Sequence, residues 1–450
     1  MRFNGSFAQQ PEDSVQASIY RGCHEIVEEW VHGGMTVARS ATAGRARRLR
    51  LTAAAVVLVP LLLTAGCSDG ERAATTASES RGHAGGGKTT SAPAVSAAKI
   101  SVTPSDGAES VEPENPVVIS AQDGKLENVA VTDEDGEKVD GKMSDDATSW
   151  RFEEGLAPGT TYTVTAQAAD SAGLTTTTKS TFDTVKARKL VRTAVVPLRG
   201  ERVGVGQPIS VRFSTSIKKA YRAEVERHMK VTSRPAVEGS WNWLDGQRLR
   251  YRPMKYWPAG TEVTLRIDLK NLKAGDDGVY GGESRTIKFT IARSMVSVVN
   301  IQKHTMSVYR DGALLRKIPV STGKKGFETR GGVKVVLSKE EHKVMDSTTV
   351  GIPKDSPEYY RLDVFWAVRV TYSGEFLHAA PWSRGSQGRA NVSHGCVGMS
   401  MEAAKWMFGN SIRGDVVEVE GNRSKLMELD NGFGDWNIPW ATWKAGSALS

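Results

Sequence analysis

The stretch SWRFEEGLAPGTTYTVTAQA, residues 149–168, carries an aromatic residue, then a turn, then a segment that alternates with period two. Alternation of this kind, bounded by Pro and Gly, is typical of a β-strand that buries one face. The stretch RLRYRPMKYWPAGTEVTLRI, residues 248–267, repeats the same plan, and each copy is followed by one further strand pattern, STFDTV or IKFTIA. Helical periodicity is scarce in this part of the chain.

This repeat predicts two tandem immunoglobulin-like β-sandwiches, whose expected task is to hold the C-terminal part of the chain away from a membrane.

A third unit begins near Ser294. MVSVVNIQKHTMSVYRDGALLRKIPVSTG alternates again, with RDG as a hairpin turn, and VFWAVRVTYSGEFLHAAPW supplies two further strands. SMEAAKWMFGN is the one convincing short helix. The fold class is therefore mainly β.

Length and charge exclude little by themselves. A chain of 450 residues is too long for one ordinary domain, and 39% hydrophobic residues are enough for packed cores. The formal charge of +8 is modest, and part of it lies in one cluster, residues 45–50. Nucleic acid is not expected as a partner. A basic surface suits an anionic polymer such as a cell wall, although net charge alone says little about partners.

RARRLRLTAAAVVLVPLLLTAGC, residues 45–67, has the layout of a secretory signal peptide, with arginines, an apolar run and then small residues. The apolar run is short for a membrane span, which needs about 20 residues. LTAGC resembles a lipobox, in which Cys67 becomes the lipidated first residue and anchors the protein at the outer face of the membrane. Plain signal cleavage and an uncleaved anchor are the alternatives.

The predicted organisation has seven parts. In chain order they are an uncertain extension (1–34), a signal peptide with lipobox (35–66), a flexible Gly/Ser/Thr-rich linker (67–98), two immunoglobulin-like domains (99–187 and 188–292), a catalytic domain (293–420) and a Trp-rich C-terminal subdomain (421–450). In the last part, Trp436, Trp440 and Trp443 are interpreted either as packing against a neighbour or as a sugar-stacking surface.

Cys396 lies in ANVSHGCVGMS, residues 390–400, and is the one cysteine after the predicted anchor. A lone thiol in an oxidising compartment is a liability unless it has a use. An imidazole can take its proton, and His378 lies at the end of a predicted strand nearby. A buried structural cysteine and a His-x-Cys metal site are the alternatives, but the usual zinc spacings are missing.

HAAPWSRGSQGRANVSHGC, residues 378–396, preceded by TYSGEF, closely resembles the signature of the L,D-transpeptidase (YkuD-type) catalytic domain. The resemblance extends through MDSTTVGIP, RGDVVEV and GFGDWNIPW, and WNWLDGQRLRYRP resembles the second sandwich of actinobacterial members. It covers residues 190–446, more weakly 100–190, and none of the first 34.

The resemblance implies roles for single residues. Cys396 matches the nucleophile and His378 the general base, whose ring is held by the carbonyl of Ala379. His394 orients the site, and Gly395 shapes an oxyanion hole. The implied substrate-binding positions are Ser373, Gly374, Met345, Val350, Ala379, Ser393 and Gly398.

Two positions depart from the family pattern. Gly398 stands where Asn is usual, and Val350 stands where the pocket loop often carries Tyr. A loop in the second sandwich, AGDDGVYGG, resembles one that holds calcium in relatives, but an expected acid is missing and calcium is not predicted.

The implied reaction joins peptidoglycan stem peptides. A tetrapeptide donor acylates the thiol with release of D-alanine, and the side-chain amine of a diamino-acid acceptor takes the acyl group in a 3→3 cross-link. No metal or organic cofactor is expected, and β-lactams of the carbapenem class are the expected covalent inhibitors. The alternatives are an L,D-carboxypeptidase, protein-to-wall acyl transfer, and a degenerate wall-binding module in which Gly398 marks lost catalysis.

Overall fold

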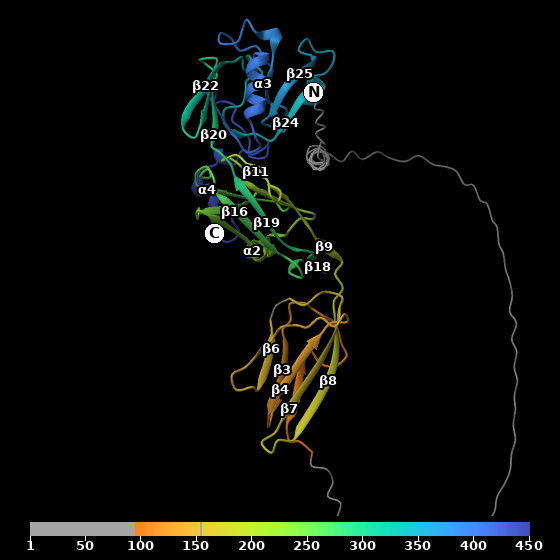
Figure 1. Ribbon diagram of the computed structural model, residues 1–450. Helices are drawn as coiled ribbons and strands as arrows, with labels where there is room; N and C mark the ends of the chain where they lie inside the picture. Colours follow the sequence, from red (N-terminus) through yellow and green to blue (C-terminus); the bar gives the residue numbers. More distant parts are fainter. Residues whose placement is uncertain (1–94, 154) are drawn as a thin grey trace, which may run out of the picture. The chain divides into compact units, whose positions relative to one another are not determined.

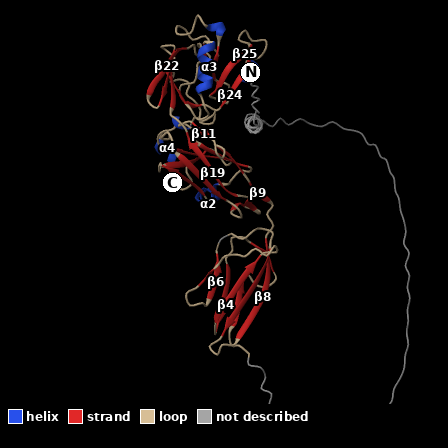
Figure 2. Ribbon diagram, viewed as in Figure 1, coloured by secondary structure: helices blue, strands red, loops and turns tan. Residues whose placement is uncertain are grey.

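The computed structural model describes residues 95–153 and 155–450 of the chain. The predicted extension, the signal segment, Cys67 and most of the linker lie outside these residues. Strands dominate the described part (Figure 2), so the mainly β fold class is confirmed. No helix among the described residues is long and apolar enough to cross a membrane.

The first sandwich consists of two four-stranded sheets, of order β1-β3-β6-β5 and β2-β8-β7-β4. The stretch at residues 149–168 forms one strand of each sheet, β6 and β7, and Gly159 in the turn between them has a φ of 71° that favours glycine. The strands are β1 (Lys99–Thr103), β2 (Ala108–Val111), β3 (Val117–Gln122), β4 (Lys125–Thr132), β5 (Lys142–Met143), β6 (Ser149–Phe152), β7 (Thr161–Ala169) and β8 (Thr175–Thr184).

The second sandwich repeats this plan with sheets of order β10-β12-β15-β14 and β11-β19-β16-β13, plus a small sheet of order β17-β18-β9. Its elements are β9 (Lys189–Val191), β10 (Thr193–Val196), β11 (Arg202–Val203), β12 (Ile209–Phe213), α2 (Lys219–Arg227), β13 (Met229–Arg234), β14 (Gly239–Trp243), β15 (Arg248–Pro253), β16 (Glu262–Asp268), β17 (Lys273–Gly275), β18 (Val279–Gly281) and β19 (Ser284–Ile291). Helix α2 was not expected from the sequence.

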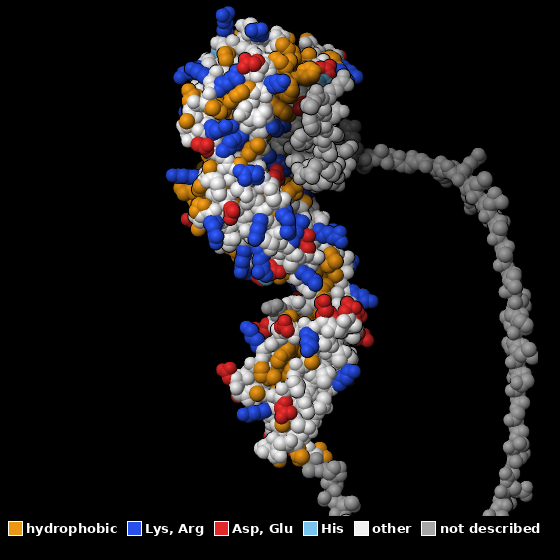
Figure 3. Space-filling model, in the orientation of Figure 1, with side chains coloured by type: hydrophobic (Ala, Val, Ile, Leu, Met, Phe, Trp, Pro, Cys, Tyr) orange, Lys and Arg blue, Asp and Glu red, His pale blue; other side chains and the backbone are white. Residues whose placement is uncertain are grey.

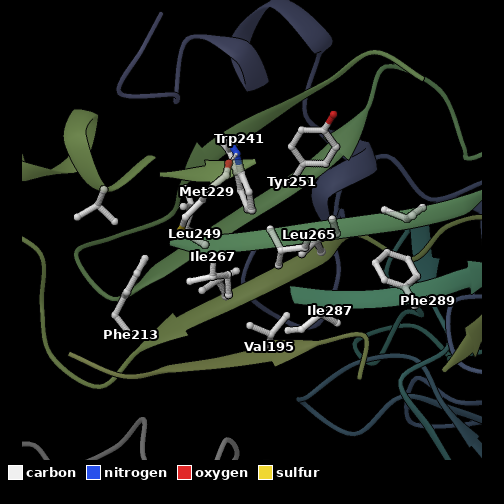
Figure 4. Close-up of a cluster of buried hydrophobic side chains, with 14 of the residues drawn as sticks. Val195, Phe213, Met229, Trp241, Leu249, Tyr251, Leu265, Ile267, Ile287 and Phe289 are labelled. Atoms are coloured by element: carbon white, nitrogen blue, oxygen red, sulfur yellow. Dashed lines mark hydrogen bonds between the residues drawn. The ribbon is translucent and has the colours of Figure 1, made fainter. Parts of the chain in front are cut away.

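Side chains at alternate positions of the strands fill the core of the second sandwich. Leu265 and Ile267 of β16 project inward, and Phe213 and Leu249 of the other sheet meet them (Figure 4). The predicted sandwich is thus built from side chains of both sheets, as period-two alternation requires.

The third unit has a five-stranded sheet, β22-β21-β20-β28-β23, and a four-stranded sheet, β24-β25-β26-β27. Helix α3 packs on β25 and β26 (Figure 1). The elements are β20 (Met295–Asn300), β21 (Thr305–Arg310), β22 (Ala313–Pro319), β23 (Gly332–Val335), β24 (Ser338–Asp346), η1 (Ser347–Val350), β25 (Arg361–Arg369), β26 (Phe376–Ala379), η2 (Pro381–Ser383), β27 (Val397–Met399), α3 (Met401–Asn410), β28 (Val416–Glu420), η3 (Asp435–Asn437) and α4 (Trp440–Lys444).

The Trp-rich tail packs against the second sandwich. Trp443 is fully buried and its Nε1 donates to the carbonyl of Ser240 at 2.9 Å, while Trp436 Nε1 donates to the carbonyl of Gly206 at 2.8 Å. The buried guanidinium of Arg252 lies over the rings of all three tail tryptophans. The packing interpretation of these residues is confirmed.

A buried ion pair joins the same two regions, and it carries a prediction. Arg250 Nη1 and Asp435 Oδ2 lie 2.9 Å apart with side chains 1% and 0% exposed. Asp435→Ala leaves the guanidinium buried without its partner, so the free energy of unfolding is expected to fall by about 3–5 kcal/mol. Urea denaturation followed by Trp fluorescence measures the loss.

The matched control is the exposed pair Arg266–Asp268 of the same sandwich, whose side chains are 66% and 44% exposed. Asp268→Ala is expected to cost about 0–1 kcal/mol. Equal losses in the two variants would show that the Arg250–Asp435 pair is not a determinant of the packing between tail and sandwich.

Candidate active site

Strand pairing brings the cysteine and one histidine to the same face of a sheet. β26 pairs in parallel with β27, with His378 opposite Gly398. Cys396 directly precedes β27, two residues before Gly398. The residues that alternate with His378 and Gly398, which are Leu377, Ala379, Val397 and Met399, belong to one buried cluster, so His378 and Gly398 lie on the other face of the sheet. Cys396 packs against Phe376 and its cluster on that same face. The structure therefore joins the two residues that the sequence singled out.

The thiol is half-buried. Cys396 packs against a buried cluster made of Val364, Ala367 and Phe376, and Met345 packs against the same cluster. Its Sγ lies 3.5 Å from the carbonyl oxygen of Gly374, to which the thiol donates. Burial raises the pKa of Cys396 to about 12, although a backbone hydrogen bond from Phe376 acts in the opposite direction. The resting group is thus a neutral thiol that needs a base.

His378 has the protonation state of a base. The side chain is buried, and its Nδ1 lies 2.8 Å from the carbonyl oxygen of Ala379. A carbonyl only accepts, so Nδ1 carries the proton and Nε2 keeps a free lone pair. Burial lowers the pKa of His378, which keeps the ring neutral. The exposed Trp382 stacks on this ring with centroids 6.0 Å apart.

The turn before the cysteine is held by the hydroxyl groups of Ser393 and Thr329. Gly395 has a φ of 124°, which a residue with a Cβ adopts only with strain. Its carbonyl accepts from Thr329 Oγ1 at 2.7 Å. Ser393 Oγ donates to the carbonyl of Cys396 at 2.6 Å and accepts from Gly395 N at 3.2 Å. These bonds fix the main chain at Gly395 and Cys396 and therefore the direction in which the cysteine side chain points.

His394 is bound to a different segment. Its Nε2 lies 2.7 Å from Glu358 Oε2, an oxygen that also accepts from Lys324 Nζ at 2.6 Å. The rings of Phe327 and Tyr360 contact the imidazole at centroid distances of 4.6 and 4.9 Å. His394 is thus tied to the loop between η1 and β25, whereas His378 lies on the strand that pairs with β27.

Comparisons with known proteins identify the family of this chain. The model of a bacterial Ig domain matches residues 108–273, and that of the L,D-transpeptidase catalytic domain (YkuD) matches residues 294–419. L,D-transpeptidase 2 of Mycobacterium tuberculosis is 37% identical over 350 residues, 78% of this chain and 85% of that protein. This chain belongs to the L,D-transpeptidase family.

Solved structures of L,D-transpeptidases are also similar to this chain. One, in complex with imipenem, has 37% identity and a TM-score of 0.45, covering 51% of this chain and 99% of the other. Another, L,D-transpeptidase 3 of Mycobacterium tuberculosis with a faropenem-derived adduct, has 36% identity and a TM-score of 0.44, covering 52% and 98%.

The positions expected to bind substrate differ in their surroundings. Met345 packs against the same buried cluster as Cys396, whereas Val350 is exposed on the 3₁₀ turn η1. Gly374 has a φ of 95°, and a Cβ built there would lie 3.2 Å from Val350 Cγ1. Ser373 bonds with its amide and its hydroxyl to the side chain of Asn431. The C-terminal tail therefore fixes the segment that precedes β26.

Gly398, one of the two departures from the family pattern, lies where space is short. A Cβ built on it would meet the Ala380 Cβ at 2.9 Å, so a side chain here requires a shift of the backbone. Replacing Gly398 by the usual Asn therefore changes the packing of β27 as well as the polarity of the site.

In the loop AGDDGVYGG, which resembles a calcium site, an aspartate is bonded to other side chains of the protein. Asp276 accepts from the ammonium of Lys218 and from the hydroxyl of Tyr221. Among the described residues there is no group of three or more His, Cys, Asp and Glu side chains that could hold a metal ion.

Sequence reasoning missed the charged groups behind this L,D-transpeptidase site. Glu375 and Lys334 form a buried ion pair, and Arg330 Nη1 lies 3.1 Å from Glu375 Oε1. Burial is the largest cause of the raised pKa of Cys396; Glu375 also raises this pKa and Lys334 lowers it, each by less. One signal was present, since Lys334 interrupts the apolar strand GVKV.

The hydrogen bond between His394 and Glu358 is expected to anchor the loop at residues 351–360. The hydrogen bond from Lys324, and then that from His394, lower the pKa of Glu358, so the carboxylate persists into mild acid. Glu358→Gln removes the charge that both partners bind, and amide hydrogen exchange in residues 351–360 is expected to become faster at pH 7.

The difference from wild type is expected to fade only as pH falls through the lowered pKa, where the wild-type carboxyl also becomes neutral. Glu341→Gln, at an exposed glutamate of β24, is the control and leaves the loop's exchange unchanged. Equal exchange in Glu358→Gln and wild type would show that the loop does not depend on this carboxylate.

Proposed function

We propose that this acyltransferase forms 3→3 cross-links between peptidoglycan stem peptides through a thioester on Cys396, with release of D-alanine. The observation that carries the proposal is a half-buried neutral thiol on the same sheet face as a buried neutral imidazole whose Nδ1 is bonded to the Ala379 carbonyl. The thiol can act as the nucleophile, and the neutral imidazole can act as the base that takes its proton.

In the first half-reaction, the sulfur of Cys396 attacks the carbonyl carbon that joins the third residue of the donor stem to its terminal D-alanine. His378 Nε2 takes the thiol proton as the C–S bond forms. The C–N bond then breaks, its electron pair stays on nitrogen, and His378 returns the proton to the departing amine. The product is a thioester and free D-alanine.

In the second half-reaction, the side-chain amine of a diamino acid on another stem attacks the thioester. His378 Nε2 takes a proton from this amine as the C–N bond forms. The C–S bond breaks, its electron pair stays on sulfur, and the sulfur recovers a proton from His378. The thiol is restored, and two third-position residues are joined.

Incubation of the purified protein with a disaccharide-tetrapeptide, followed by mass spectrometry, tests the proposal. A dimer with loss of one D-alanine is the expected product, and Cys396→Ala is expected to give none. A tripeptide without dimer would indicate an L,D-carboxypeptidase. Unchanged substrate with the wild-type protein would favour a wall-binding module.

β-lactams of the carbapenem class are proposed to acylate the same thiol, and imipenem makes the base testable. Because the His378 pKa is lowered by burial, the ring is neutral at pH 7, and wild-type acylation is expected to stay level from pH 7 to 9. In His378→Ala the rate at pH 7 is expected to fall by about 10²–10⁴.

The rate of that variant is then expected to rise roughly tenfold per pH unit, because the pKa of about 12 leaves the thiolate scarce throughout this range. Intact-protein mass across the pH series measures both rates. Wild-type rates in His378→Ala at pH 7 would assign the base to another group, with His394 the first candidate.

The proposed site of action is the outer face of the membrane, with a lipid on Cys67. The arginine-led apolar run that ends in TAGC supports this proposal. Cys67→Ala is expected to move the protein from the membrane fraction to the medium, or to block its processing. Unchanged membrane retention with normal processing would contradict a lipid anchor.

A further inference from the structure

The outer face of one sheet of the second sandwich is basic. In β16, Val263, Leu265 and Ile267 point into the core, so Thr264 and Arg266 project outward. The same alternation places outward-facing side chains along β13, β19 and β11. Figure 3, viewed as in Figure 1, shows Lys and Arg side chains gathered on the face that carries β16 and β19.

Strand register places several of these cations in one row. Lys230 of β13 lies opposite Arg266 of β16, which in turn lies opposite Thr286 of β19. Arg199 Nη2 donates to the carbonyl of Thr286 at 2.6 Å, so a further guanidinium lies beside β19 at the end of this row. In the neighbouring row, the exposed Lys288 lies opposite Thr264.

The row of cations on neighbouring strands lowers the stability of the sheet, so a purely structural role does not explain it. Like charges directly opposite each other on neighbouring strands are destabilising. Asp268 lies 2.8 Å from Arg266 and offsets one charge, and Glu262 lies opposite Arg234 in another row. Within the described residues, Lys230 and Lys288 form no ion pair.

We propose that this face binds a linear phosphodiester polymer. Neighbouring strands lie about 4.8 Å apart and alternate residues about 6–7 Å apart, so the cations are spaced over the open face of the sheet. Such a surface fits an extended chain that carries charge at each repeat. Arginine forks donate to two oxygens of one phosphate, and the threonine hydroxyls between the cations supply further donors.

The proposal concerns the second sandwich alone and does not depend on the chemistry at Cys396. A polymer bound to this face would retain the protein through many weak, salt-sensitive contacts. Each contact would be made by one phosphate. Such binding releases counterions, so its affinity falls as salt concentration rises.

Binding of a synthetic poly(glycerol phosphate) to the purified protein, measured over a range of salt concentrations, tests the inference. The triple variant Lys230→Gln, Arg266→Gln and Lys288→Gln is expected to bind roughly tenfold or more weakly at about 0.1 M salt. Its slope of log affinity against log salt is expected to be smaller by about two, because three cations are removed.

The matched control is Lys125→Gln, Arg151→Gln and Lys179→Gln in the first sandwich. These residues are exposed, the charge change is the same, and Arg151 pairs with Glu153 as Arg266 pairs with Asp268. The control is expected to keep wild-type affinity and slope.

Equal losses in the two triples would overturn the proposal by showing that net charge alone matters. Poly-L-glutamate and vesicles of phosphatidylglycerol are measured in parallel and are expected to bind more weakly. Wild-type binding that is as tight for either of them would also overturn the assignment to a phosphodiester polymer.

Discussion

The active site depends on one parallel strand pair. β26 carries His378, β27 begins directly after Cys396, and their register places Gly398 beside His378. Because the cysteine itself lies in a turn, its direction is set by Gly395 and by the hydrogen bonds of Ser393 and Thr329. A slip of β26 by one residue against β27 would turn His378 to the opposite face of the sheet, away from the thiol.

Burial gives both reacting groups their chemical form. The same loss of water that raises the pKa of Cys396 lowers that of His378, so the resting site holds a thiol and a neutral imidazole. Proton transfer then accompanies attack on the substrate. The buried pair of Lys334 and Glu375 and the tail residue Asn431 hold the segment before β26 in place.

Local signals in the sequence predicted much of this molecule. The two alternating repeats, the hairpin at RDG and helix α3 with its Ser400 cap all have short-range signatures. Helix α2 has mostly polar residues and no side-chain cap, so its sequence does not distinguish it from a loop. The partnership of His394 with Glu358 spans 36 residues and joins a loop to a turn, and no local pattern encodes it.

The central claim is that the thiol and the imidazole rest as a neutral pair. ¹⁵N NMR of the imidazoles at pH 7, with the His378 signals assigned by their loss in His378→Ala, tests it most directly. The account predicts a protonated Nδ1 and an unprotonated Nε2 for His378, unchanged in Cys396→Ala. Two protonated ring nitrogens in the wild type, reverting to one in Cys396→Ala, would show a thiolate–imidazolium ion pair and contradict the account.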